Sequence, residues 1–147
     1  MKNIKPKLVR LFKQGYCTPQ ISKIAKAIRE PSATIHYNIK KMEDDGAIKT
    51  YKAVFDYKKI DEGFCAYVLI KLTPSEFDKP IAEELAKLKE VESAATIAGQ
   101  WDLILKVRAK SQDEYYDVLK RAISKKGVRD TLTLVTLKDI KTNFILL

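Results

Sequence analysis

Residues 18–46, TPQISKIAKAIREPSATIHYNIKKMEDDG, contain two helical patterns separated by a short break. In the first pattern, apolar residues recur at i, i+3, i+4 and i+7 from Ile21. The dipeptide Thr18-Pro19 predicts its start, because Thr is a favoured N-cap and Pro a favoured first helical residue. Pro31 disfavours helical backbone at the residue before it, so a second helix is predicted over 32–45. Two short helices joined by a tight turn are typical of a helix-turn-helix.

The outer face of the second helix carries side chains suited to contact DNA. Thr34 can offer its methyl group to thymine, and Asn38 can bind adenine through two hydrogen bonds. Lysines follow farther along, where phosphates could be met, and acidic residues gather only at the far end. The ordinary alternative is a solvated helix face. The predicted DNA contacts are Ser32, Ala33, Thr34, His36, Tyr37, Asn38, Lys40, Lys41 and, beyond the helix, Lys49.

The net charge of the chain, +9, lies in its first part. Residues 1–60 carry 14 Lys and Arg against 5 Asp and Glu, whereas residues 61–147 carry 14 against 14. A basic module followed by a neutral one predicts contact between the first part and a polyanion. This favours double-stranded DNA as the partner of a regulator. An architectural DNA or RNA binder without sequence preference is the alternative that charge alone leaves open.

The remaining patterns of the first part predict a domain boundary near residue 50. A helix is expected over 6–14, and alternating residues predict a strand over 48–55. Residues 56–63 form a hinge. The expected organisation is a DNA-binding domain over 1–50, a strand and hinge over 51–63, and a second domain over 64–147.

The second domain repeats the order strand, helix, strand. This order predicts a ferredoxin-like βαββαβ arrangement, so the expected fold class is α+β with a four-stranded antiparallel sheet and both helices on one face. The strands are expected at 64–72, 91–98, 103–107 and 129–137, and the helices at 78–89 and after Ser111. The other face would carry Tyr67, Leu69, Ile104, Val135 or their neighbours, and it is too apolar to be left wet. A symmetric partner is the simplest cover, so a homodimer with paired DNA-binding heads is predicted.

Several classes of protein are disfavoured by composition. No apolar run approaches the roughly 20 residues of a membrane helix, and no apolar segment follows the charged N-terminus, so a cytoplasmic protein without a membrane partner is expected. The chain has one His and two widely separated cysteines, which disfavours a zinc site. Free thiols are expected, with a Cys17–Cys65 disulfide left open. No catalytic constellation stands out, so neither an enzyme nor a cofactor is expected.

Short motifs along nearly the whole chain then carry a family resemblance. In the first part they are Ile24-Ala25, Thr34-Ile35, Ile39 and Met42-Glu43-Asp44-Asp45-Gly46-Ala47-Ile48-Lys49. In the second they are Val91, Gly99-Gln100-Trp101-Asp102 and Gly127-Val128-Arg129-Asp130-Thr131-Leu132-Thr133. The chain resembles the Lrp/AsnC family of transcription regulators. The resemblance implies an N-terminal winged helix-turn-helix, a C-terminal effector domain, dimers that assemble into octamers, and amino acids as effectors.

The resemblance also implies where an effector would bind. Carried over residue by residue, the effector set is Gly99, Trp101, Asp102, Thr131 and Thr133. Glycine lets backbone amides approach a carboxylate, Asp can pair with an ammonium group, and Thr hydroxyls add hydrogen bonds. The alternative is that the Gly-x-aromatic-Asp segment is only a turn and that Trp101 packs an oligomer interface.

The sequence departs from the family pattern at several positions. Arg29-Glu30-Pro31 replaces the usual Gly-Leu-Ser of the turn, and Asn38 stands where an Arg is expected. Ala98 replaces a Thr before the effector turn, and Ile4-Lys5-Pro6-Lys7 replaces acidic residues ahead of the first helix. Some relatives of the fold resemble haem-pathway decarboxylases with histidine-lined pockets, but the only His here is His36.

Overall fold

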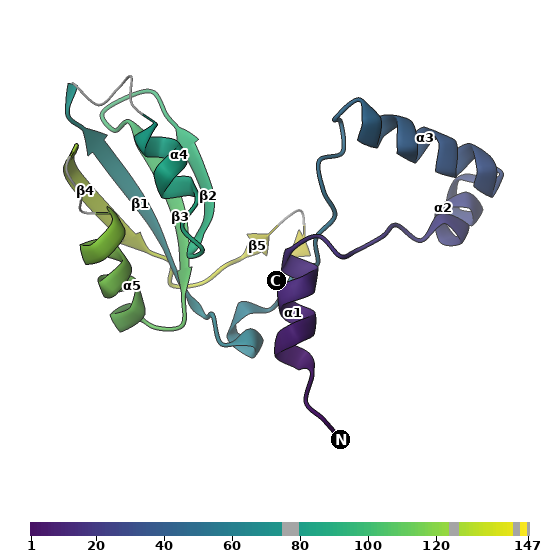
Figure 1. Ribbon diagram of the computed structural model, residues 1–147, viewed down its shortest axis with the longest axis horizontal. Helices are drawn as coiled ribbons and strands as arrows, with labels where there is room; N and C mark the ends of the chain where they lie inside the picture. Colours follow the sequence, from purple (N-terminus) through teal and green to yellow (C-terminus); the bar gives the residue numbers. More distant parts are fainter. Residues whose placement is uncertain (75–79, 124–126, 143–144, 147) are drawn as a thin grey trace. The chain divides into compact units, whose positions relative to one another are not determined.

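The computed structural model describes residues 1–74, 80–123, 127–142 and 145–146 (Figure 1). The chain divides into two compact units, residues 1–55 and residues 56–147. The first unit is helical, and the second consists of a sheet with helices packed on it.

The first unit contains three helices, α1 (Lys5–Lys13), α2 (Ile21–Ile28) and α3 (Ser32–Asp44). Helices α2 and α3 pack against each other. The buried residue of α2 is Ala25, and the buried residue of α3 is Ile35. The predicted start of the second helix at Thr18-Pro19 is wrong. Gln20 precedes the helix in a non-helical conformation (ψ 87°), so α2 begins at Ile21, where the apolar stripe also begins. Packing of that stripe, rather than local capping preference, sets the boundary.

The turn between α2 and α3 is built around Arg29. Its backbone is left-handed (φ 57°, ψ 45°), and the next amide, Glu30 N–H, donates to Ala25 O at 3.1 Å. Pro31 follows in an extended conformation and leads directly into α3. The predicted helix-turn-helix is therefore present, with an arginine holding the backbone geometry that glycine adopts without strain.

The chain after α3 is ordered by hydrogen bonds but forms no strand. Gly46 is left-handed (φ 80°), as expected for a helix end, and Ile48 N–H donates to Met42 O at 2.9 Å. The predicted strand over 48–55 is wrong for the described chain. A strand needs a partner for its backbone groups, and no other extended segment of the first unit pairs with it.

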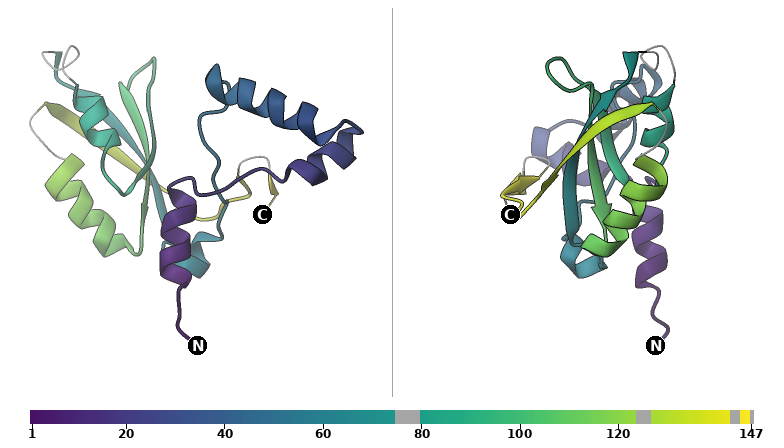
Figure 2. Two further views of the ribbon diagram at one scale, coloured as in Figure 1. Left: turned by 45° about the vertical axis from the view of Figure 1, so that its right-hand side comes forward. Right: turned by 90° about the vertical axis from the view of Figure 1, so that its left-hand side faces the viewer.

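The second unit forms the predicted ferredoxin-like sheet (Figures 1 and 2). Its four strands are antiparallel in the order β2-β3-β1-β4. The strands are β1 (Phe64–Leu72), β2 (Val91–Thr96), β3 (Leu103–Ala109) and β4 (Val128–Val135). The helices are α4 (Ile81–Ala86) and α5 (Gln112–Val118), the latter continued by a π-helical turn, Leu119–Ile123. A 3₁₀ turn, η1 (Tyr57–Ile60), precedes the sheet, and a short hairpin, β5 (Lys141–Thr142) with β6 (Ile145–Leu146), follows it.

The predicted helix over 78–89 is shorter in the structure, and residues 78 and 79 lie outside the described part. Ser111, which the sequence predicts as the N-cap of the helix that follows it, is confirmed as the cap of α5, because its Oγ accepts from Glu114 N–H at 3.2 Å. The Glu114 carboxylate in turn accepts from Lys110 N–H, so side chains satisfy amides at this helix start.

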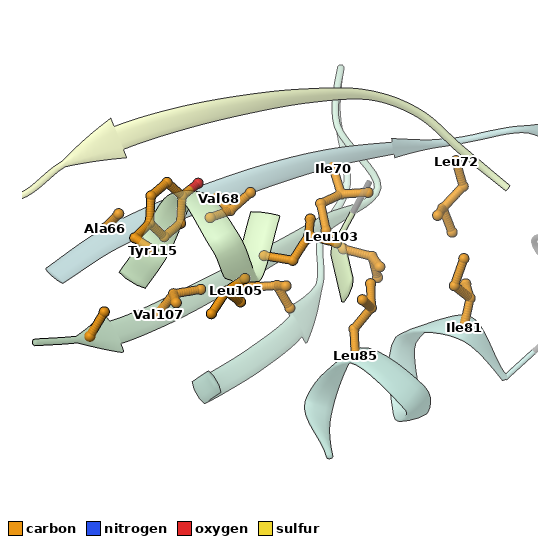
Figure 3. Close-up of a cluster of buried hydrophobic side chains, with 13 residues drawn as sticks. Ala66, Val68, Ile70, Leu72, Ile81, Leu85, Leu103, Leu105, Val107 and Tyr115 are labelled. Atoms are coloured by element: carbon orange, nitrogen blue, oxygen red, sulfur yellow. The ribbon is translucent and has the colours of Figure 1, made fainter. Parts of the chain in front are cut away.

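The core lies between the sheet and its two helices (Figure 3). Alternate residues of β1 and β3 point into it and meet Ile81 and Leu85 of α4 and Tyr115 and Val118 of α5. Alternation over residues 64–72 predicts one face formed by Phe64, Ala66, Val68, Ile70 and Leu72. The last four are buried and Phe64 is half-buried against the same cluster, so the predicted face is confirmed. Because this apolar layer is continuous, the second unit holds the strands and turns of the candidate effector site rigidly.

Candidate functional site

The predicted DNA contacts on α3 are all exposed. Ser32, Ala33, Thr34, His36, Tyr37, Asn38, Lys40, Lys41 and, beyond the helix, Lys49 face solvent. Helix α3 turns Ile35 inward, so its polar side remains open over its length. A groove of duplex DNA could therefore be approached by this face without rearrangement of the helix.

Two side chains of this face are held by local contacts in the free protein. Asn38 Nδ2 donates to Thr34 O at 2.8 Å, one turn earlier in the helix. Lys40 Nζ lies 3.9 Å from Asp44 Oδ1 in an exposed pair, a type of ion pair that contributes little to stability. Both side chains remain exposed despite these contacts.

The acidic residues at the end of α3 hold the following chain. Asp45 Oδ1 accepts from Ala47 N–H at 2.9 Å, and Glu43 Oε1 accepts from the Tyr51 hydroxyl at 2.8 Å. Two of these carboxylates therefore stabilise the chain that follows α3 through hydrogen bonds.

The Gly99–Asp102 turn is fixed to the sheet by Asp102. Its Oδ2 accepts from Leu72 N–H at 2.8 Å, and its Oδ1 lies 3.3 Å from Lys71 Nζ. The carboxylate is nearly buried, so it satisfies a backbone amide at the end of β1 as well as a lysine. Gly99 has φ 124°, a conformation that only glycine adopts easily.

A cavity of about 190 Å³ opens beside this turn and is lined by Lys71, Gln100, Trp101, Arg129 and Asp130. It therefore presents two cations, a carboxylate, an amide and an indole. Of the residues predicted for the effector, only Trp101 lines it. Lys71 is the only charged residue in an otherwise apolar strand, Phe64–Leu72, and this was the signal in the sequence that could have revealed it.

Thr131 and Thr133 lie on a different face from this cavity. They pair with Ile70 and Val68 across the β1–β4 ladder, so their side chains share the helix-covered face. Thr133 Oγ1 is hydrogen-bonded to the Tyr115 hydroxyl, and burial raises the pKa of that phenol. The structure does not bring these two hydroxyls into the cavity that Trp101 lines.

The face of the sheet opposite the helices is partly covered at one end by a buried arginine. Arg108 is 7% exposed, its Nε donates to Glu92 Oε2 at 2.6 Å, and its guanidinium lies 3.6 Å from the ring centre of Tyr57. Burial alone would lower the pKa of Arg108, but the charge and hydrogen bond of Glu92 raise it above its ordinary value. This contact fixes η1 on the sheet.

The rest of this face is mainly apolar, apart from the half-buried Lys106, which lies opposite Tyr67 in the ladder with its Nζ 3.6 Å from Glu92 Oε1. Tyr67, Leu69 and Ile104 are half-buried, and Leu132 and Leu134 are exposed. The prediction that Val135 lies on this open face is wrong, because Val135 pairs with Ala66, whose side chain faces the helices. Leu132 and Leu134, which pair with Leu69 and Tyr67, lie on the open face instead.

Other chemistry is sparse in the described part of the chain. Its His, Cys, Asp and Glu side chains form no group of three able to hold a metal ion. Cys17 and Cys65 are both free thiols. None of its helices combines the length and apolar character needed to cross a bilayer.

A helix-turn-helix with an open polar recognition face, followed by a ferredoxin-like domain with a polar cavity at a strand end, defines a two-part DNA-binding regulator. The profile described as the Lrp/AsnC ligand binding domain matches residues 65–146. The chain belongs to the Lrp/AsnC family of transcription regulators, as the resemblance predicted.

Individual relatives agree with this assignment. An uncharacterized HTH-type transcriptional regulator of Pyrococcus furiosus is 35% identical over 124 residues, covering 82% of this chain and 83% of the relative. The HTH-type transcriptional regulator FL11 of Pyrococcus horikoshii is 27% identical over 96% of this chain and 92% of its own length.

Solved structures share the fold. A crystal structure of an AsnC family transcriptional regulator from Agrobacterium tumefaciens has a TM-score of 0.77 at 24% identity, covering 99% of this chain and 96% of that one. A Neisseria meningitidis transcriptional regulator solved as an L-Met complex has a TM-score of 0.72 at 20% identity, covering 97% and 93%.

Proposed function

We propose that the protein is a sequence-specific DNA-binding transcription regulator whose activity is modulated by an amino acid. The observation that carries the proposal is the exposed outer face of α3, which presents Thr34, Asn38 and Lys41 together on a helix-turn-helix. Regulators named among its relatives support the same reading. Thr34 and Asn38 would read base edges, and Lys41 and Lys49 would meet phosphates.

The effector is proposed to bind at the cavity beside the Gly99–Asp102 turn. Arg129 forms no ion pair with the described residues, and Asp130 bonds only its neighbouring amide, Thr131 N–H. A guanidinium and a carboxylate in one cavity suit the carboxylate and ammonium of a zwitterion. Trp101 would pack the effector's side chain, while Asp102 supports the cavity by holding Lys71. Thr131 and Thr133 would affect effector binding only indirectly, by stabilising β4, the strand that carries Arg129 and Asp130.

The open sheet face is proposed to pair two copies of the chain. Its exposed leucines, Leu132 and Leu134, need cover, and a two-fold partner supplies the same surface in return. A dimer would place two α3 helices on half-sites about 34 Å apart, or a multiple of that spacing. Larger assemblies such as octamers, a cytoplasmic location and the absence of enzymatic activity belong to the same proposal.

The experiment that tests this function is selection of bound duplexes from random DNA, repeated with each common amino acid. A sequence-specific regulator should enrich one motif and prefer it to random duplex by about 10³-fold or more at physiological salt. At least one amino acid should change that preference. Equal affinity for every duplex would instead identify an architectural DNA binder, the competing reading that the basic first unit permits.

Substitution of the predicted base-reading side chains sharpens the test. Asn38→Ala or Thr34→Ala should weaken the selected site by about 1–3 kcal/mol while leaving random-duplex binding nearly unchanged. Gln112→Ala, which removes an exposed amide side chain of the second unit, serves as a comparison outside the predicted DNA contacts. Equal losses on both duplexes, measured by fluorescence anisotropy, would contradict a base-reading role for these side chains.

A further inference from the structure

The first 29 residues carry eight Lys and Arg side chains, and the first acidic residue of the chain is Glu30. This excess of positive charge precedes the recognition helix α3. Part of it lies on α1, a helix that takes no part in the DNA contacts proposed for α3. A segment of this length without a single carboxylate cannot balance its charge internally. It therefore needs counterions or a polyanion.

Helix α1 arranges part of this charge in a row. Lys7, Arg10 and Lys13 follow at intervals of three residues, so neighbouring members are about 4.5 Å apart along the helix axis. Of the apolar residues of α1, Leu8 lies about 100° around the helix from Lys7, whereas Leu11 lies next to the row, about 40° from Lys7. Lys7 and Arg10 are exposed and form no ion pair with the described residues.

Helix stability accounts for the positive charge at only some positions of this row of cations on α1. Arg10 and Lys13 lie in the last turn, where positive charge interacts favourably with the helix dipole. Lys7 lies near the opposite end, where positive charge is unfavourable, and the first turn of α1 contains no acidic residue. Cations three residues apart also repel one another. The free helix would be more stable with a neutral residue at position 7, so its charge points to a partner.

Arg29 gives a second, independent sign of the same requirement. It is exposed and left-handed, a conformation that costs a non-glycine residue about 1–2 kcal/mol, and it forms no ion pair with the described residues. A non-glycine residue held in a strained backbone conformation is a candidate for function.

We propose that the exposed cations of α1 form a phosphate-binding surface that contacts the DNA backbone independently of base sequence, and that Arg29 contacts a phosphate separately, from the turn between α2 and α3. This inference rests on the proposed function, because it assumes that the duplex already lies against α3. Lys7 and Arg10 would each replace condensed counterions at one phosphate, and α3 would supply the sequence preference. An anionic membrane is a poorer partner, because α1 spans only nine residues.

The experiment compares two charge-matched double variants of the full chain. Lys7→Gln/Arg10→Gln removes two charges from α1, and Lys87→Gln/Lys89→Gln removes two exposed lysines of the second unit. Glutamine favours helices nearly as well as Lys and Arg, so circular dichroism should show no loss of helix. Affinity for the selected duplex and for random duplex is measured from 0.05 to 0.3 M salt, with binding to anionic phosphatidylserine vesicles as a separate arm.

For each head engaged, the α1 variant should reduce the slope of log affinity against log salt by about 1.8, which is roughly 30-fold in affinity at 0.15 M salt. The loss should be equal on both duplexes, so that the specificity ratio is retained, and the control variant should leave the slope unchanged. An unchanged slope in the α1 variant, an equal loss in the control, or a loss confined to vesicle binding would overturn the inference while leaving the regulator intact. A wild-type chain that binds no duplex would overturn the proposed function itself.

Discussion

The two units of the chain differ in how much apolar surface they bury. In residues 1–55, all of which the structure describes, the buried hydrophobic residues are Ala25 and Ile35. In the second unit, side chains from the sheet and both helices form one continuous buried cluster. Apolar residues that the helical patterns would turn inward, such as Leu8, Ile28 and Met42, are exposed in the first unit.

This contrast separates stability from recognition. Hydrophobic burial is the main favourable contribution to folding, so the second unit should carry most of the stability of the free chain. The first unit instead carries the net charge, which repels itself until a polyanion neutralises it. Binding of DNA would then stabilise the unit that packing leaves weak.

The largest expected effect comes from truncating one apolar side chain in each unit. Leu105→Ala removes a side chain with 0% exposure from the sheet core, and should lower the free energy of unfolding by about 3 kcal/mol. Met42→Ala, at 45% exposure on α3, should cost less than about 1 kcal/mol. Urea denaturation at one fixed protein concentration measures both. Similar losses in the two variants would show that the first unit has a core comparable to that of the second.

The same contrast explains how far the sequence predicted the fold. In the second unit the period-two pattern of Phe64–Leu72 agreed with the buried face, because a continuous core enforces that period. In the first unit the alternation of residues 48–55 did not produce a strand. Alternation states which face a strand would bury, but it does not supply a second strand to pair with. The prediction from capping preference at Thr18-Pro19 failed for a related reason, since α2 and its apolar stripe begin only at Ile21.

A smaller effect should separate two acidic residues near the effector cavity. Asp102→Ala leaves Leu72 N–H buried without its acceptor and should cost about 2 kcal/mol of stability. Asp130→Ala removes an exposed carboxylate and should change stability by less than about 0.5 kcal/mol, yet it should abolish the response to the amino acid. Urea denaturation and the shift of melting temperature with added effector measure the two properties. Loss of the response in a fully stable Asp102→Ala protein would reverse these roles.

The candidate effector site shows what a motif in sequence can and cannot predict. The Gly99–Asp102 motif located the turn correctly, because Gly99 needs its unusual backbone and Asp102 caps the end of β1. Gln100, which lines the cavity with Trp101, belongs to the same turn, but the charged lining residues come from β1 and from the start of β4. Lys71 and Asp130 are brought together only by the register of those two strands, which no local pattern in the sequence encodes.

The smallest effect concerns the left-handed non-glycine residue described in each unit, Arg29 in the first and Asp61 in the second. Arg29→Gly should stabilise the first unit by about 1 kcal/mol, because glycine adopts this backbone without a Cβ clash. Asp61→Gly should change stability by only a few tenths of a kcal/mol, because Asp tolerates the left-handed region better than Arg. Arg29→Ala is the matched control, since it keeps the Cβ and removes only the rest of the side chain.

Hydrogen exchange of the α2 and α3 amides measures the stability of the first unit directly. If Arg29→Ala stabilised the helices as much as Arg29→Gly, the cause would be charge repulsion rather than backbone strain. If Arg29→Gly destabilised them, packing of the arginine would be the property that the first unit preserves.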